Sequence, residues 1–192
     1  MSWTVGDDGR ARCAWAAGTA DYREYHDTEW GRPVRGDREL FERLTLEAFQ
    51  SGLSWITILR KRENFRAAFS NFEVEAVAAF TERDSERLMS DAGIVRNRAK
   101  IAATITNARA LSTWHDAEGD GVLDELIWSF AQTDRARPAT VAEIESQSAQ
   151  SRELSKALKK RGFVFIGPTT MHAAMQAIGV IDDHVEGCWL AD

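Results

Sequence analysis

The sequence predicts an all-α fold, and three observations support this prediction. Apolar residues recur with the spacing of an α-helix through most of the chain. Residues that commonly cap helices stand before several of these apolar stripes, and glycine follows several of them. Residues 163–166 are the only strand-like run, and a lone strand has no partner with which to form a sheet.

Two helices are expected early in the chain. Asp37 is placed to cap the first, which ends near Gly52. The apolar face of this helix consists of Leu40, Phe41, Leu44 and Ala48. Ser54 is placed to cap the second, which is expected to continue to about residue 69. The turn between the two helices therefore falls at residues 52–54.

A helical hairpin is expected in the middle of the chain. Thr81 and Asp84 resemble a capping box for a short helix that ends near Met89. A turn at residues 91–93 then leads into a helix over about residues 96–111. The residues of that helix expected to face the core are Ile101, Ile105 and Ala108.

The remaining helices lie in the last third of the chain. A helix is expected over about 123–130, followed by a polar loop with a short helical turn over 131–150. A basic helix follows over 151–161 and is stopped by Gly162. Pro168 marks the start of the last helix. Its apolar stripe consists of Met171, Met175 and Ile178.

Length and composition predict one soluble domain over residues 1–192. The chain is 44% hydrophobic and 28% charged, and no apolar run is long enough to cross a membrane. No signal peptide is recognisable, so a cytoplasmic protein is the expectation. A monomer is expected because nothing in the sequence suggests an interface. A net charge of −6 argues against a protein that binds polyanions over its whole surface, but a local basic face remains compatible with it.

Both cysteines of the chain belong to one pattern, in which Cys13 precedes His26 and His184 precedes Cys188. Two thiolates and two imidazoles are the ligand set of a closed structural zinc site. The alternatives are unrelated cysteines with two core histidines, or a disulfide, for which no secretory signal provides an oxidising compartment. We expect one structural zinc that joins residues 13–30 to residues 180–190, with residues 1–12 peripheral.

Two basic elements are candidates for DNA contact. In the hairpin, Gly93 lies in the turn and Arg96, Arg98 and Lys100 open the next helix, where backbone amides and positive charge favour phosphate. In the helix over 151–161, the basic residues are Arg152, Lys156, Lys159, Lys160 and Arg161. For each element the alternative is a solvated basic helix face without a partner.

A third group of candidates is aromatic and acidic. Trp15, Tyr22, Tyr25 and Trp30 surround the first cysteine–histidine pair, and Trp55 follows the helix that contains Glu47. Glu47 lies three residues after Leu44, on or beside the apolar face of its helix. A buried carboxylate among aromatic rings needs a cationic or hydrogen-bond-donating partner. A flipped-out base with a delocalised positive charge would be such a partner.

Several long motifs resemble the 3-methyladenine DNA glycosylase I family. The resemblance runs from about Cys13 to Cys188 and includes Tyr25-His26-Asp27-Thr28-Glu29-Trp30-Gly31, Gly52-Leu53-Ser54-Trp55-Ile56-Thr57, Lys61-Arg62-Glu63-Asn64, Asp91-Ala92-Gly93-Ile94, Leu154-Ser155-Lys156-Ala157-Leu158-Lys159-Lys160-Arg161-Gly162-Phe163 and Asp183-His184-Val185. The resemblance implies a helix-hairpin-helix glycosylase bundle with a zinc clip. It implies excision of 3-methyladenine from double-stranded DNA that contains alkylated bases.

The resemblance also implies roles for individual residues. Glu47 is the carboxylate that recognises the methylated base, and Leu53 is the candidate wedge into the DNA stack. The walls of the base pocket are Trp15, Tyr22, Tyr25 and Trp55. The backbone grip is the hairpin at Gly93, and the zinc ligands are Cys13, His26, His184 and Cys188. His115 and His172 receive no role as ligands.

The chain departs from the wider superfamily in one respect. Many helix-hairpin-helix glycosylases place a catalytic aspartate soon after the hairpin, whereas residues 101–111 contain no acidic residue. The resembled family shares this absence, because a cationic methylated base leaves as a neutral molecule and needs no general acid. The alternatives left open are a zinc-stabilised DNA-binding module without activity and a glycosylase for another alkylated base.

Overall fold

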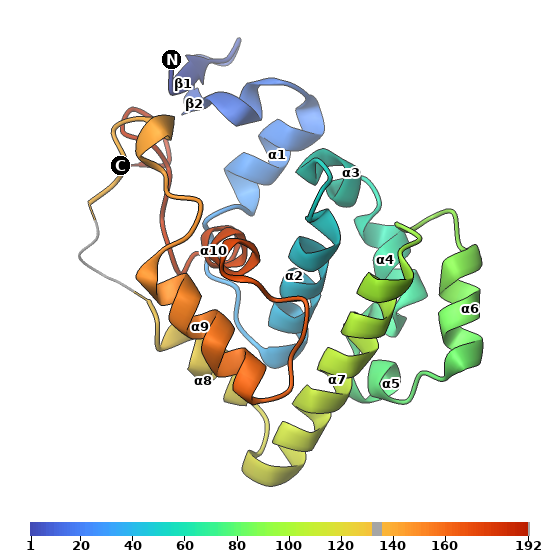
Figure 1. Ribbon diagram of the computed structural model, residues 1–192. Helices are drawn as coiled ribbons and strands as arrows, with labels where there is room; N and C mark the ends of the chain where they lie inside the picture. The colour runs from blue at the N-terminus through green and yellow to red at the C-terminus, as the bar shows by residue number, and fades with distance from the viewer. Residues whose placement is uncertain (132–135, 192) are drawn as a thin grey trace.

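The computed structural model describes residues 1–131 and 136–191, and helices dominate it (Figure 1). The α-helices are α1 (Ala20–Thr28), α2 (Asp37–Gln50), α3 (Trp55–Leu59), α4 (Arg62–Ala68), α5 (Val74–Ala78), α6 (Glu82–Ser90), α7 (Arg98–Glu118), α8 (Val122–Trp128), α9 (Ala149–Lys160) and α10 (Pro168–Ala177). Short 3₁₀ turns lie at Ala14–Ala17, Ser70–Phe72 and Val141–Glu143. The last of these is the helical turn expected within 131–150, a loop whose residues 132–135 lie outside the described part of the chain.

The two ends of the chain meet at one side of the molecule, next to a small β-hairpin (Figure 1). Strands β1 (Trp3–Val5) and β2 (Ala11–Cys13) pair antiparallel, with Trp3 opposite Cys13. The all-α prediction missed this hairpin because strands of three residues are too short to show an alternating pattern. Residues 163–166 form no strand, as expected.

Helix α2 lies at the centre of the bundle, where it packs against α10, α3, α7 and α8. Its predicted apolar face is buried, and Phe49 at its end joins a group of phenylalanine rings from α4 and the turn after it. The ring centroids of Phe49 and Phe65 lie 4.7 Å apart, and those of Phe65 and Phe69 lie 6.2 Å apart. Each fully buried ring contributes roughly 1.5–3 kcal/mol, so this group anchors α2 firmly.

The helix expected from Ser54 to about residue 69 is divided into α3 and α4 at Arg60 and Lys61. Lys61 adopts φ −99° and ψ −1°, which interrupts the regular helix. Its ammonium donates hydrogen bonds to the carbonyls of Ala92 and Gly93 at 2.9 and 3.1 Å. These hydrogen bonds attach the start of α4 to the turn of the predicted hairpin.

Asp37 is the first residue of α2 rather than its cap, which is Gly36. The Asp37 carboxylate accepts hydrogen bonds from the backbone amides of Gly121 (3.0 Å) and Asp124 (2.8 Å), at the start of α8. The Asp124 carboxylate accepts one from the amide of Gly36 at 2.8 Å. The starts of α2 and α8 thus cap each other. His115 Nε2 lies 2.7 Å from the same Asp37 carboxylate, which gives this histidine a structural partner.

We predict that Asp37→Ala lowers the free energy of unfolding by about 1–3 kcal/mol, because two helix-start amides lose their acceptor. Urea unfolding followed by circular dichroism measures the change. Asp116→Ala is the matched control, since Asp116 is exposed on α7, and its effect is expected to stay within about 0.5 kcal/mol. Equal stability of the two variants would contradict the cross-capping role.

Candidate active site and metal centre

A cavity of about 360 Å³ opens between α1, α2, α3 and α10. Its lining consists of Trp15, Tyr22, Tyr25, Trp30, Glu47, Gln50, Ser54, Trp55, Ile144, Ala173 and Gln176. The structure therefore brings the five residues expected at a base pocket into one cavity, although they are spread over forty positions of the chain. The volume and the flat aromatic walls suit a small planar ligand.

The aromatic walls support one another by edge-to-face contacts. The Trp15 ring lies 5.7 Å from that of Tyr22 and 5.1 Å from that of Trp30, at interplanar angles of 77° and 76°. The Tyr25 and Trp55 rings lie 5.3 Å apart. The Tyr22 hydroxyl accepts a hydrogen bond from the backbone amide of Ile56, which fixes the start of α3 to α1. These contacts hold the cavity open without a ligand.

Glu47 is buried in this cavity with an exposed fraction of 5%. Burial raises the pKa of its carboxyl to about 8, and the positive charge of Arg43 opposes this shift only in part. No donor among the described residues forms a hydrogen bond with the carboxylate. The Arg43 guanidinium instead donates to Glu29 at 2.9 Å. With a pKa of about 8 and no hydrogen-bond partner among the described residues, Glu47 is mainly protonated at neutral pH in the empty cavity. A cation bound beside it would stabilise the carboxylate, so the cavity favours a cationic ligand.

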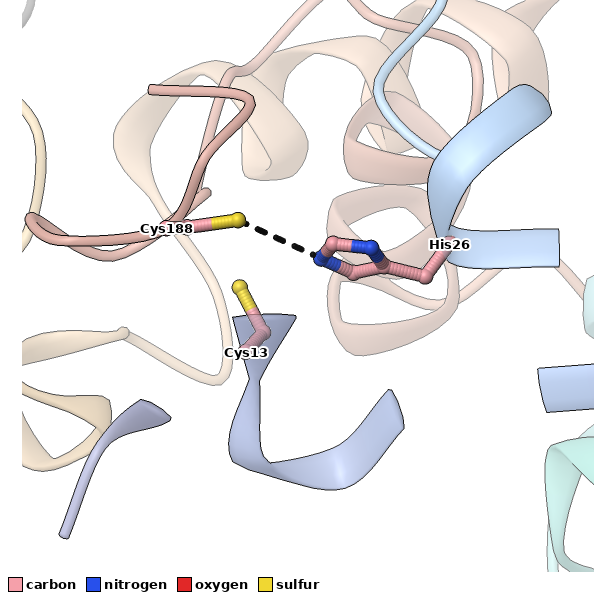
Figure 2. Close-up of side chains that lie close together, drawn as sticks. All are labelled: Cys13, His26 and Cys188. Carbon is pink, nitrogen blue, oxygen red and sulfur yellow. Dashed lines mark hydrogen bonds between the residues drawn. The ribbon is translucent and has the colours of Figure 1, made fainter. Parts of the chain in front are cut away.

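Three predicted metal ligands converge at the joined ends of the chain (Figure 2). The donor atoms of Cys13, His26 and Cys188 all lie within 4.8 Å of one another, and all three residues are buried. Cys188 Sγ lies 3.5 Å from His26 Nε2. Both cysteines are free thiols, so no disulfide joins them. Hydrogen bonds from Cys13 and His26 lower the pKa of the Cys188 thiol, which favours the thiolate that a metal ion requires.

His184, the fourth predicted ligand, lies beside this group but outside it. Its ring centroid is 5.2 Å from that of His26. Its Nδ1 lies 2.7 Å from Asp182 Oδ1, and its buried Nε2 has no hydrogen-bond partner. His26 is arranged alike, with Nδ1 2.9 Å from Asp27 Oδ1. In both rings a carboxylate holds Nδ1 and leaves Nε2 for a ligand bond, an arrangement typical of metal-bound histidine.

The residues that support the predicted metal ligands, Asp27 and Arg12, were not predicted from the sequence. Burial raises the pKa of Asp27, but hydrogen bonds from Arg12 and His26 outweigh this effect and lower the pKa to about 2. Arg12, which belongs to the stretch expected to be peripheral, is buried and bonds both Asp27 and Asp8. Gln50 and Gln176 in the cavity were also missed. Carboxylates and amides are too common for spacing alone to single them out.

The residues expected to face DNA are exposed, with one exception. Leu53 is 43% exposed in the turn after α2, where Gly52 adopts φ +83°. Gly93 lies in the turn before α7, and Arg96 and Arg98 are exposed beside it. Arg98 also contacts Glu82 at 3.3 Å. Lys159 and Lys160 are exposed on the last turn of α9. Exposed positive charge thus lies beside the Gly93 turn and on the last turn of α9.

Lys100 is the exception, because its side chain is buried rather than directed to solvent. The ammonium donates hydrogen bonds to the carbonyls of Phe49 (2.8 Å) and Ser51 (2.6 Å), at the end of α2. Burial lowers its pKa. The predicted phosphate contact therefore does not fit this geometry. Lys100 instead fixes the turn that bears Leu53.

Comparison with known proteins identifies the family of this chain. The family model for methyladenine glycosylases matches residues 15–191. The chain belongs to the methyladenine glycosylase family. It is 48% identical over 179 residues to DNA-3-methyladenine glycosylase 1 of Escherichia coli K12, a match that covers 92% of this chain and 95% of the relative.

Solved structures of this glycosylase family share the fold. A crystal structure of 3-methyladenine DNA glycosylase I superposes with a TM-score of 0.88 at 44% identity, over 93% of this chain and 98% of the other. A Staphylococcus aureus 3-methyladenine DNA glycosylase I, described in terms of its recognition of 3-methyladenine, gives a TM-score of 0.86 at 34% identity, over 93% and 95%. Among the described residues, no helix is long and apolar enough to cross a membrane.

We predict that Glu47→Gln stabilises the glycosylase at high pH. A carboxyl whose pKa rises from 4.5 unfolded to about 8 folded binds more protons in the folded state between these values, so the stability of the wild type falls as the pH rises through that window. The melting temperature of the variant should match that of the wild type below pH 4.5 and exceed it above pH 8.

Differential scanning fluorimetry across this pH range measures the effect. Glu24→Gln, an exposed substitution on α1, is the control and is expected to follow the wild type at every pH. A Glu47→Gln variant that is equally or less stable than the wild type above pH 8 would contradict the burial of an unpaired carboxylate.

Proposed function

We propose that this methyladenine glycosylase excises 3-methyladenine from alkylated double-stranded DNA by hydrolysing the N-glycosidic bond. The observation that carries the proposal is Glu47, which is buried in an aromatic cavity of about 360 Å³ and has no hydrogen-bond partner within residues 1–131 and 136–191. A flat cation meets both requirements, because its charge pairs with the carboxylate and its faces stack on the rings. The names of the related proteins agree with this substrate.

Recognition in the cavity supplies most of the selectivity. Methylation at N3 gives the nucleoside a positive charge, and the Glu47 carboxylate accepts hydrogen bonds from the exocyclic amine of the base. Hydrogen bonds to a charged group are worth about 1.5–3 kcal/mol, and stacking adds roughly 1–3 kcal/mol per base. Unmodified adenine lacks the charge and leaves Glu47 desolvated. Discrimination therefore follows from the carboxylate rather than from groove contacts.

Bond cleavage places few demands on the protein. The methylated base departs as a neutral molecule, so no general acid has to protonate it. This agrees with the absence of acidic residues between 101 and 111, where α7 begins. The positive charge of the nucleoside already weakens the glycosidic bond. The protein extrudes the nucleotide, binds the base beside Glu47 and admits water to the sugar.

DNA is held by the side of the molecule that carries the turn with Leu53 and the turn with Gly93. Leu53 acts as the wedge that fills the space left by the extruded base. The Gly93 amide itself donates to Asp91 Oδ1 at 2.7 Å, so the α6–α7 hairpin holds the DNA backbone at the first turn of α7 instead. Arg96 and Arg98 supply charge there. Lys159 and Lys160 add a second phosphate contact. Because these contacts read no bases, the enzyme binds along DNA without sequence preference.

Cys13, His26, His184 and Cys188 are proposed to hold one structural zinc. The unpartnered Nε2 of His184 and the carboxylate-held Nδ1 atoms of both histidines fit this role. A bound zinc would link the two ends of the chain. Four protein ligands leave no coordination position for water, so the chemistry stays in the cavity. A cytoplasmic, monomeric state remains a prediction.

We predict that the wild type releases free 3-methyladenine from methylated duplex DNA and that Glu47→Gln slows release by roughly 10- to 100-fold, the loss expected for a charged hydrogen-bond partner. Chromatography of the released base under single-turnover conditions measures the rates. Glu24→Gln, which lies outside the cavity, should match the wild type. Absence of release by folded wild-type protein would favour a non-catalytic DNA-binding module or another lesion.

We also predict that the purified protein contains one zinc per chain and that Cys188→Ser loses most of it with a lower melting temperature, because a hydroxyl is a poor zinc ligand. Elemental analysis and thermal unfolding measure both effects. Glu186→Gln, an exposed neighbour of Cys188, is the control and should retain the metal. Full zinc content in Cys188→Ser would refute the ligand assignment.

A further inference from the structure

The connection between α9 and α10 presents two apolar side chains to solvent. Val164 and Phe165 are 42% and 44% exposed, whereas the flanking Phe163 and Ile166 are buried. Phe165 adopts φ +61°, a left-handed backbone conformation that is unfavourable for a bulky residue. Strain of this kind persists only where the surrounding structure enforces it, and it is often associated with function.

Buried polar side chains enforce this conformation. Asn107 of α7 accepts a hydrogen bond from the amide of Val164 at 2.7 Å and donates one to its carbonyl at 3.1 Å. Ser155 of α9 donates to the carbonyl of Ile166 at 2.7 Å. Both Asn107 and Ser155 are buried. The loop runs between α9 and α7 in Figure 1, and these hydrogen bonds attach it to both helices.

The helix that holds this loop also holds the turn with Leu53. Lys100 and Asn107 lie seven residues apart on one face of α7, about 10 Å along its axis. Lys100 binds the carbonyls of Phe49 and Ser51, just before Leu53. Two loops with exposed apolar side chains are therefore attached to the same face of one helix.

Basic residues lie next to the loop. Arg152, Lys156, Lys159 and Lys160 of α9 line a cavity of about 440 Å³ together with Pro168, the first residue of α10. This charge is complementary to DNA phosphates. Apart from Leu53, the other large exposed apolar residues of the described chain belong to the end near the metal centre and are Met1, Trp3, Val5 and Val141. Phe165 therefore lies close to the basic residues of α9 that are proposed to bind DNA phosphates.

We propose that Phe165 is a second DNA wedge, which packs against the bases of the duplex beside the extruded nucleotide. Phenylalanine and leucine side chains are typical wedges between base steps. The strained backbone directs the ring outward, and the basic side chains of α9 hold the adjoining phosphates. This inference rests on the glycosylase function proposed above, because it places Phe165 on the same duplex that Leu53 enters.

The decisive variant is Phe165→Gly. Glycine adopts a positive φ without strain, so the variant should keep or raise the melting temperature. Loss of an aromatic contact to DNA should nonetheless slow single-turnover release of 3-methyladenine from methylated duplex by about tenfold. Phe165→Leu should restore most of the rate, because leucine is also a wedge. Val141→Gly, an equally exposed apolar site at the other end, should leave the rate unchanged.

Binding of free 3-methyladenine, followed by tryptophan fluorescence, distinguishes a failure of the Phe165 wedge from a failure of the proposed glycosylase function. Unchanged binding of the base by Phe165→Gly, together with slow release from duplex, supports the wedge. A wild-type rate in Phe165→Gly would overturn it, and so would a loss of rate that accompanies a lower melting temperature or weaker binding of the free base. A wild type that neither binds the base nor releases it would count against the proposed function instead.

Discussion

The return of the C-terminal segment to the start of the chain is the interaction on which the rest of the site depends. The amide of Trp189 donates to the carbonyl of Ala11, and its indole lies near Asp27. Only Tyr25 and His26 of α1 are buried, so α1 has little core of its own to hold it. Tyr25 faces the cavity and His26 the metal centre, which makes the position of an aromatic wall depend on the joining of the chain ends.

The second constraint is that Glu47 is not paired with the nearest arginine of its own helix. Arg43 lies one turn before Glu47 in α2 and could pair with it. Instead, Arg43 and Arg62 both donate to Glu29, and these hydrogen bonds outweigh burial and lower the pKa of Glu29 to about 2. A direct Arg43–Glu47 pair would satisfy the carboxylate and remove its need for a cationic base. Burial of Glu47 without a paired arginine costs stability, which the proposed recognition of a cationic base would explain.

Sequence reasoning succeeded where local chemistry decides the outcome. The capping box at Thr81 and the helix start at Pro168 are set within one turn of helix, and both are present. The cavity residues were expected mainly from the family resemblance, to which the grouping of aromatic residues and the place of Glu47 beside an apolar helix face added support. Helices α1 and α5 were missed, since their stability comes from packing and from the joined ends. Asp37 and Lys100 were misjudged because each is paired with backbone groups 49 to 87 positions away, which no local pattern reveals.

Helix α7 shows how such distant pairings shape function. Lys100, Thr104 and Asn107 form a buried polar stripe along one face, in a protein whose helix faces are otherwise mainly apolar. Thr104 bonds the carbonyl of Lys100, while the other two residues bond loops from α2 and from the α9–α10 connection. Apolar contacts tolerate sliding, but hydrogen bonds weaken steeply with distance and angle. Polar clamps on a rigid helix therefore fix the turns of Leu53 and Phe165 more sharply than packing alone could. Fixed loop positions of this kind are what the proposed contacts of Leu53 and Phe165 with a duplex require.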